Sequence, residues 1–83
     1  MSLALVESEI LHYLVKEPRT IGELHRLTRI RTSVIYGALV RLFHKGLVRK
    51  VGEKWALTEL GRKIALTSLA MKYAELLPMP RSS

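Results

Sequence analysis

The sequence lacks cysteine, aspartate, asparagine and glutamine altogether, and only 6% of its 83 residues are aromatic. The absence of cysteine excludes disulfide bonds and thiolate metal sites. No apolar run approaches the roughly 20 residues of a membrane span. No basic segment precedes the apolar pattern at the start of the chain, as a secretory signal would require. We therefore expect an intracellular protein with no membrane segment.

Residues suited to catalysis or metal binding are also scarce. The four glutamates within residues 1–28 have no partnered histidine, and no glycine-rich phosphate loop follows a strand. His12, His25 and His44 are spread over three expected helices without the spacing of metal ligands. We therefore expect no enzyme activity, no metal and no cofactor, and no small-molecule site is evident.

Positive charge is concentrated in the middle of the chain. The net charge is +7, of which residues 29–54 contribute +6 and residues 1–28 contribute −1. A concentrated basic stretch is typical of a surface that meets phosphate groups. A solvated face that keeps the protein soluble is the alternative interpretation, and the charge alone does not separate the two.

Apolar spacing predicts three helices in the first half of the chain, over residues 3–15, 21–27 and about 32–45. Thr20 and Glu23 have the spacing of a capping box at the start of the second helix. Thr32 or Ser33 is expected to cap the third helix. Two helices joined by a short turn, the second with a polar and basic outer face, form the helix-turn-helix arrangement.

The second half predicts a hairpin and a long helix. Two β-prone runs, 47–51 and 55–58, flank a turn at 52–54. A helix capped by Thr58 is expected over 59–77, followed by a flexible tail over 78–83. The expected fold is mainly α with a small β-hairpin, and residues 1–77 form one domain with a three-helix core and a long C-terminal helix.

Two stretches resemble a known family. Residues 32–48 form a capped helix with a polar face that ends in a basic residue and Gly46-Leu47-Val48, and Leu57-Thr58-Glu59-Leu60-Gly61-Arg62 opens the next helix. In this order, over roughly residues 5–66, the chain resembles MarR-like and PadR-like transcriptional regulators. The resemblance implies a winged helix-turn-helix whose partner is double-stranded DNA, and a cytoplasmic, nucleoid-associated location.

The third helix and its flanks supply the expected DNA contacts. The outer positions of the helix are Thr32, Ser33, Val34, Tyr36, Gly37, Val40, Arg41 and His44. Phosphate and wing contacts are expected from Arg29, Arg31, Lys45, Arg49, Lys50 and Lys54. Arg41 has the side chain for a bidentate contact to guanine. Gly37 either permits close approach to DNA or is a small residue at a crowded helix crossing, and Trp55 is interpreted as a packing residue.

The first and last helices carry apolar faces wider than one small core needs. Leaving both in water would expose a larger patch than a soluble monomer normally tolerates, so we expect a homodimer. The expected interface residues are Leu3, Leu11, Val15, Leu66, Leu69, Ala70, Tyr73, Leu76 and Leu77. A two-fold dimer would place two recognition helices about 34 Å apart on a palindromic site.

The leading hypothesis is a sequence-specific transcriptional regulator that acts as a repressor. Two alternatives stay open from the sequence. One is a weakly specific, chromatin-like DNA-binding protein, which the few base-reading side chains allow. The other is a winged helix that binds another protein, because this fold also serves as a protein-interaction module.

Overall fold

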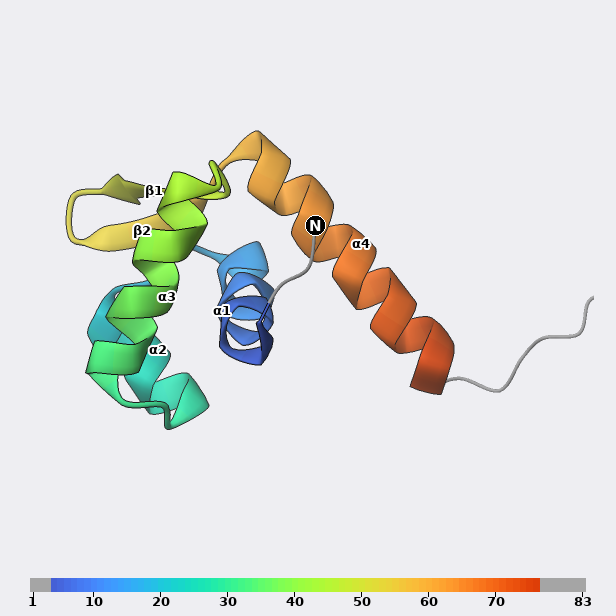
Figure 1. The fold of residues 1–83 in the computed structure, drawn as a ribbon, viewed down its shortest axis with the longest axis horizontal. Helices are drawn as coiled ribbons and strands as arrows, with labels where there is room; N and C mark the ends of the chain where they lie inside the picture. Colours follow the sequence, from blue (N-terminus) through green and yellow to red (C-terminus); the bar gives the residue numbers. More distant parts are fainter. Residues whose placement is uncertain (1–3, 77–83) are drawn as a thin grey trace, which may run out of the picture.

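A computed structural model describes the backbone of residues 4–76 and the side chains of residues 4–67. This part of the chain forms four helices and one two-stranded antiparallel sheet (Figure 1). In chain order the elements are α1 (Leu5–Lys16), α2 (Ile21–Thr28), α3 (Thr32–His44), β1 (Val48–Val51), β2 (Lys54–Leu57) and α4 (Glu59–Leu76). The predicted fold is confirmed, with element bounds within two residues of those expected. The expected tail, 78–83, lies outside the described residues.

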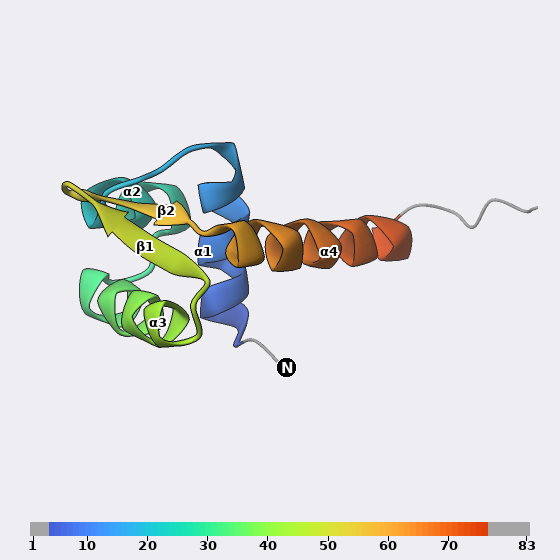
Figure 2. The same ribbon diagram turned by 90° about the horizontal axis from the view of Figure 1, so that it is seen from above.

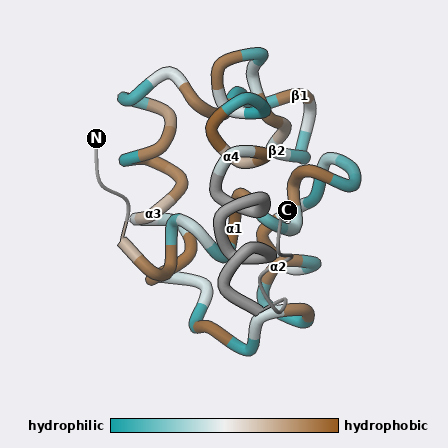
Figure 3. Tube along the Cα trace, turned by 90° about the vertical axis from the view of Figure 1, so that its right-hand side faces the viewer, coloured by the Kyte–Doolittle hydropathy of each residue, from teal (hydrophilic) through white to brown (hydrophobic). Residues whose placement is uncertain are grey.

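The core lies where α1, α2 and α3 pack together and the hairpin closes one side. Each of these helices alternates between hydrophobic and hydrophilic stretches (Figure 3), as amphipathic helices do. Figure 2 shows α4 passing beside α1 and then leading away from this body as a single rod. The largest fully buried side chains of the core are Ile10, Leu11, Leu14, Leu24, Ile35, Leu39, Leu42, Leu47 and Val48.

One residue expected at a dimer interface belongs to this core instead, and a second packs against it. Leu11 is only 1% exposed, so it is not available to a second copy, and its assignment to the interface is wrong. Val15 is half-buried and packs against the same core. The physical reason is that α1 is surrounded: it contacts α2, α3, β2 and α4. Its wide apolar face is therefore used within one domain.

The hairpin is joined to the rest of the domain by a backbone bridge. Gly52 has φ +62° and stands first in the two-residue turn, the position that glycine occupies in type II′ turns. On the other edge of β2, Trp55 exchanges two backbone hydrogen bonds with Arg19, at 2.7 and 3.0 Å. The connection between α1 and α2 thus serves as a one-residue third strand that holds the hairpin.

Thr58 joins three elements at the start of α4. Its hydroxyl donates to the carbonyl of Gly46 at 2.7 Å and accepts from the backbone N–H of Gly61 at 3.0 Å, which confirms the predicted cap. Its own N–H donates to the carbonyl of Leu47 at 3.0 Å. The end of α3, the end of β2 and the first turn of α4 therefore meet at one side chain.

Candidate nucleic-acid interface

The start of α2 is fixed by the predicted capping box. The Thr20 hydroxyl accepts from the N–H of Glu23 at 3.1 Å, and the Glu23 carboxylate accepts from the N–H of Thr20 at 2.9 Å. Both bonds satisfy amide groups that would otherwise lack a helical partner. Because α2 packs against α3, this cap helps to set the orientation of the helix that follows.

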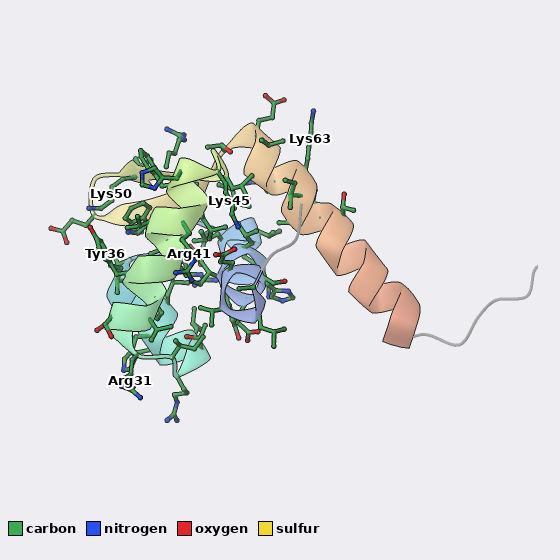
Figure 4. The ribbon with its side chains drawn as sticks, viewed as in Figure 1. Arg31, Tyr36, Arg41, Lys45, Lys50 and Lys63 are labelled. Atoms are coloured by element: carbon green, nitrogen blue, oxygen red, sulfur yellow. The ribbon has the colours of Figure 1, made fainter. Side chains whose placement is uncertain are left out.

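The turn between α2 and α3 is held by side chains of the last two turns of α2. Arg29 has φ +64° and ends α2 in the left-handed conformation, with its N–H donating to the carbonyl of His25. The Thr28 hydroxyl accepts from the N–H of Ile30 at 3.2 Å, and the His25 ring nitrogen Nδ1 lies 2.7 Å from the Ile30 carbonyl oxygen. Arg29 and Arg31 project from this turn as exposed cations, and Figure 4 shows Arg31 at its outer end.

The third helix begins without the predicted side-chain cap. Its N-cap is Arg31, and Thr32 is already the first helical residue, so the expectation that Thr32 or Ser33 caps the helix is wrong. This leaves both hydroxyl groups exposed on the first turn. A helix N-terminus with free amides and exposed hydroxyls is suited to contact with phosphate oxygens.

The outer face of α3 has the exposure that the sequence predicts. The exposed members are Thr32, Ser33, Val34, Tyr36, Arg41 and His44, whereas Gly37 and Val40 are half-buried. Ile35, Ala38, Leu39 and Leu42 cover the opposite face and are buried. The centre of the outer face carries small side chains, and longer ones stand at its two flanks.

One flank of α3 is tied to α1 by a buried carboxylate that the sequence analysis did not single out. Glu7 is only 2% exposed and accepts from Arg41 Nε at 2.6 Å and from Lys45 Nζ at 2.8 Å. Figure 4 shows Arg41 and Lys45 on the side of α3 that faces α1. Pairing within the domain argues against the phosphate contact predicted for Lys45. It also means that Arg41 has only its two terminal nitrogens for a guanine contact.

These cations keep the buried carboxylate ionised. Burial raises the pKa of Glu7, but the hydrogen bonds from Lys45 and Arg41, together with the charge of Lys45 and a backbone hydrogen bond at Ala4, outweigh it, so that the pKa lies below its usual value. Glu7 falls three and four residues before Ile10 and Leu11, which places it on the apolar face of α1. An acidic residue on such a face is the feature of the sequence from which a buried ion pair could have been predicted.

The other flank of α3 faces the hairpin, which carries exposed cations. Arg49, Lys50 and Lys54 are all exposed, and Lys50 Nζ lies 5.4 Å from the centre of the Trp55 ring. Trp55 is 7% exposed, so its interpretation as a packing residue is confirmed. Its buried Nε1 has no hydrogen-bond partner among the described residues.

Two open grooves run between α3 and the hairpin. The first reaches the N-terminus of α2 and is lined by Thr20, Ile21, Gly22, Tyr36, Lys50, Glu53 and Trp55. The second lies further along α3 and is lined by Tyr36, Val40, Phe43, Lys50 and Trp55. Both are open to solvent, and Figure 4 shows Tyr36 and Lys50 together on this side. Such grooves fit an extended surface such as a nucleic-acid backbone better than an enclosed small molecule.

The remaining residues of the expected dimer interface are only partly described. On α4, Leu66 and Leu60 are each 49% exposed. On α1, Leu5 is 88% exposed. Leu3, Leu69, Ala70, Tyr73, Leu76 and Leu77 lie outside the residues whose side chains are described. Exposed leucines are therefore present on both α1 and α4, although Leu60 and Leu5 were not among those assigned to the interface.

No group of three histidine or acidic side chains in the described part of the chain is placed to hold a metal ion. Among the described helices, even α4 lacks the long apolar stretch that crossing a bilayer requires.

Comparison with solved structures shows which fold this is. The MarR family protein Rv2887 of Mycobacterium tuberculosis superposes with a TM-score of 0.79 at 27% identity, over 87% of this chain and 56% of that one. The adhesin competence repressor AdcR of Streptococcus pyogenes gives 0.84 at 20% identity, over 90% and 61%. The transcriptional repressor BigR of Xylella fastidiosa gives 0.72 at 18% identity, over 92% and 80%. The chain thus spans somewhat more than half the length of the first two.

Comparison with protein families identifies the chain more closely. No curated protein matches it. The family model for the N-terminal domain of the methanogenesis regulatory protein FilR1 matches residues 2–74. The resemblance to MarR-like regulators that the sequence predicts is confirmed by the superpositions. This chain is a winged helix-turn-helix domain and belongs to the family of the N-terminal domain of the methanogenesis regulatory protein FilR1.

Proposed function

We propose that this domain binds double-stranded DNA and regulates transcription, with α3 in the major groove and the hairpin against the neighbouring backbone. One observation carries the proposal: exposed cations stand at both the turn before α3 and the hairpin beside it. They are Arg29, Arg31, Arg49, Lys50 and Lys54. An exposed helix between two basic flanks matches the shape and charge of a groove bordered by phosphates.

The contacts divide into two kinds. The cations of the turn and hairpin meet phosphates, which gives affinity and salt dependence but little sequence choice. Sequence choice falls to α3, whose outer face offers Ser33, Tyr36, Arg41 and His44 as polar groups. At the centre of that face, Gly37 and Val40 have short side chains that protrude little, so that the helix backbone can come close to the bases.

The direct test is a titration of mixed-sequence duplex DNA, followed by fluorescence anisotropy at two salt concentrations. We expect affinity to fall steeply as salt rises, because each phosphate contact releases about 0.9 of a counterion. Binding no stronger than that of a generic basic protein would contradict the proposal. It would favour the alternative of a winged helix that binds another protein.

A charge-reversed hairpin sharpens the test. Arg49→Glu combined with Lys50→Glu should abolish binding at moderate salt, because two attractive contacts become repulsive ones. Lys63→Glu is the control, since Lys63 is exposed on α4, well away from the hairpin (Figure 4). Its affinity should stay within a few-fold of the wild type. Circular dichroism would verify that each variant is folded.

We further propose that the domain acts as a homodimeric repressor. The exposed leucines of α1 and α4 support self-association, because they would otherwise remain in water. The names of AdcR and BigR describe repressors, which supports the same role for a chain of this fold. A dimer should protect a two-fold symmetric site in a footprinting experiment, and protection of a single half-site would contradict it.

The small side chains at the centre of α3 favour a second candidate, a weakly specific DNA-binding protein. The two functions differ in the ratio of affinities for different duplexes. A regulator should bind a duplex selected from a random pool at least about 1,000 times more tightly than a scrambled one. A chromatin-like protein should bind both almost equally.

A further inference from the structure

Glu7 is the one buried charged residue among the described side chains, and its two partners lie on α3 and at the C-cap of α3. Removing a carboxylate from water is costly unless its oxygens are fully paired. Here one oxygen takes Arg41 Nε and the other takes Lys45 Nζ. A packing role alone is filled more cheaply by an apolar residue of similar size. The reason for a carboxylate at this position is therefore to be sought in Arg41 and Lys45, the two side chains that it binds.

The geometry of Arg41 supplies such a reason. Its Nε edge is bound to Glu7, while the side chain as a whole is 54% exposed. Nη1 lies beside Gly37, one turn earlier: a Cβ atom on that glycine would be in ordinary van der Waals contact with it, at 3.7 Å. The guanidinium group is therefore laid along α3 beside the centre of its outer face.

An arginine held in this way differs from a free one. A free side chain loses rotamer freedom when it binds, whereas one already fixed by a buried partner has lost much of it before binding. The Nη1 and Nη2 pair forms a fork that matches the O6 and N7 acceptors of guanine in the major groove. Pairing at Nε leaves that fork intact.

We propose that Glu7 is a positioning residue, which holds Arg41 beside Gly37 so that Nη1 and Nη2 contact a guanine in the bound duplex. This inference rests on the proposed DNA binding and adds to it the residue that sets base choice. Lys45 takes the second carboxylate oxygen, so that neither oxygen of Glu7 is left unpaired.

The experiment compares affinities for two duplexes, one selected by the wild-type protein from a random pool and a scrambled one of equal composition. Glu7→Gln should lower the ratio of the two affinities about tenfold, because the arginine is no longer held. Binding to the scrambled duplex should stay the same or become tighter, because a negative charge has been removed. A merely structural role would weaken both complexes together.

Two further variants keep the test decisive if Glu7→Gln folds poorly. Arg41→Lys retains a cation beside Glu7 but lacks the terminal fork, so it should lose the same discrimination, and adding Glu7→Gln to it should cause no further loss. Lys45→Met leaves the bond between Glu7 and Arg41 in place and should change discrimination less than twofold.

The outcomes that overturn the inference are distinct from those that overturn the proposed function. Undiminished discrimination in Arg41→Lys, or an equal loss for both duplexes in a folded Glu7→Gln variant, overturns the inference alone. If the wild-type protein binds no duplex in a salt-dependent way, the proposed function fails and the inference fails with it.

Discussion

Gly61 lies against the backbone of Leu47, so closely that a Cβ atom at position 61 would stand 1.9 Å from the Leu47 carbonyl oxygen. That oxygen also accepts the N–H of Thr58, and it belongs to backbone rather than to a side chain that can turn away. The first turn of α4 therefore sits on the segment that connects α3 to β1 at a distance that only glycine allows. This contact fixes where the long helix begins.

The first prediction concerns this contact. Gly61→Ala should lower the free energy of unfolding by roughly 2 kcal/mol, the scale of overpacking in a tight site. Gly22→Ala is the control, because Gly22 is exposed in α2 and a Cβ there has its nearest contact at an ordinary 3.8 Å. Alanine favours the helix at that position, so this variant should be more stable than the wild type. Urea denaturation measures both, and a stable Gly61→Ala variant would contradict the close contact.

The second prediction separates stability from binding at Arg29. Arginine is strained at φ +64°, and Arg29→Gly should raise the free energy of unfolding by about 1 kcal/mol. It should also weaken DNA binding and lower the slope of affinity against salt by about one contact. Arg29→Ala removes the same cation but keeps the strain, so it should weaken binding without gaining stability. An unchanged salt slope in both variants would show that Arg29 contacts no phosphate.

The third prediction is a dependence of stability on pH. Glu7 and Glu23 both have a lowered pKa in the folded protein; for Glu23 the main cause is the hydrogen bond from the N–H of Thr20. As the pH falls, the unfolded chain takes up protons first, near the usual value of about 4.3. The contribution of Glu7 and Glu23 to the stability of the fold is thus present above that pH. It is lost as the pH falls through their lowered pKa values in the folded protein.

The measurement is the free energy of unfolding between about pH 5 and pH 3. The wild-type protein should become steadily less stable over this range, and Glu7→Gln should reduce the slope. Glu9→Gln serves as the comparison, because it removes an exposed carboxylate from the same helix and should leave the slope close to that of the wild type. Equal slopes in all three proteins would show that Glu7 does not contribute to the pH dependence of stability.

The fourth prediction tests self-association through α4. Leu66→Glu should move the sedimentation coefficient toward that of a monomer, because it places a charge on a leucine that is half exposed. Thr67→Glu adds the same charge at the next, exposed position of the helix and should dimerise as the wild type does. A wild-type protein that is monomeric at micromolar concentration would contradict the homodimer itself.

Local sequence patterns were sufficient for most of the fold. The capping box of Thr20 and Glu23, the cap at Thr58 and the turn after Val51 are each decided by residues within four positions of one another. The missing cap at Thr32 shows the limit even of local patterns. Neighbouring hydroxyls in a turn offer several possible starts, and the helix begins at Thr32, before either hydroxyl could cap it, with Arg31 as its N-cap.

Long-range pairing was beyond these patterns. Glu7 lies 34 residues from Arg41, and nothing in the spacing of either shows that α1 would bring the two together. The same difficulty explains Leu11, because the width of an apolar face does not reveal whether one domain or two copies cover it. The exposed outer face of α3 was predictable, since its core stripe is regular and the remaining positions follow from it.

Thr58 helps to fix the angle between α3 and α4. Its three hydrogen bonds clamp the end of α3 to the base of α4, so the rod cannot swing without breaking them. In a dimer joined through α4, the separation of the two recognition helices would then be set at this pivot, not along the rod. A small tilt here would be multiplied by the length of α4, so in such a dimer the hydrogen bonds of Thr58 would influence the distance between the two copies of α3.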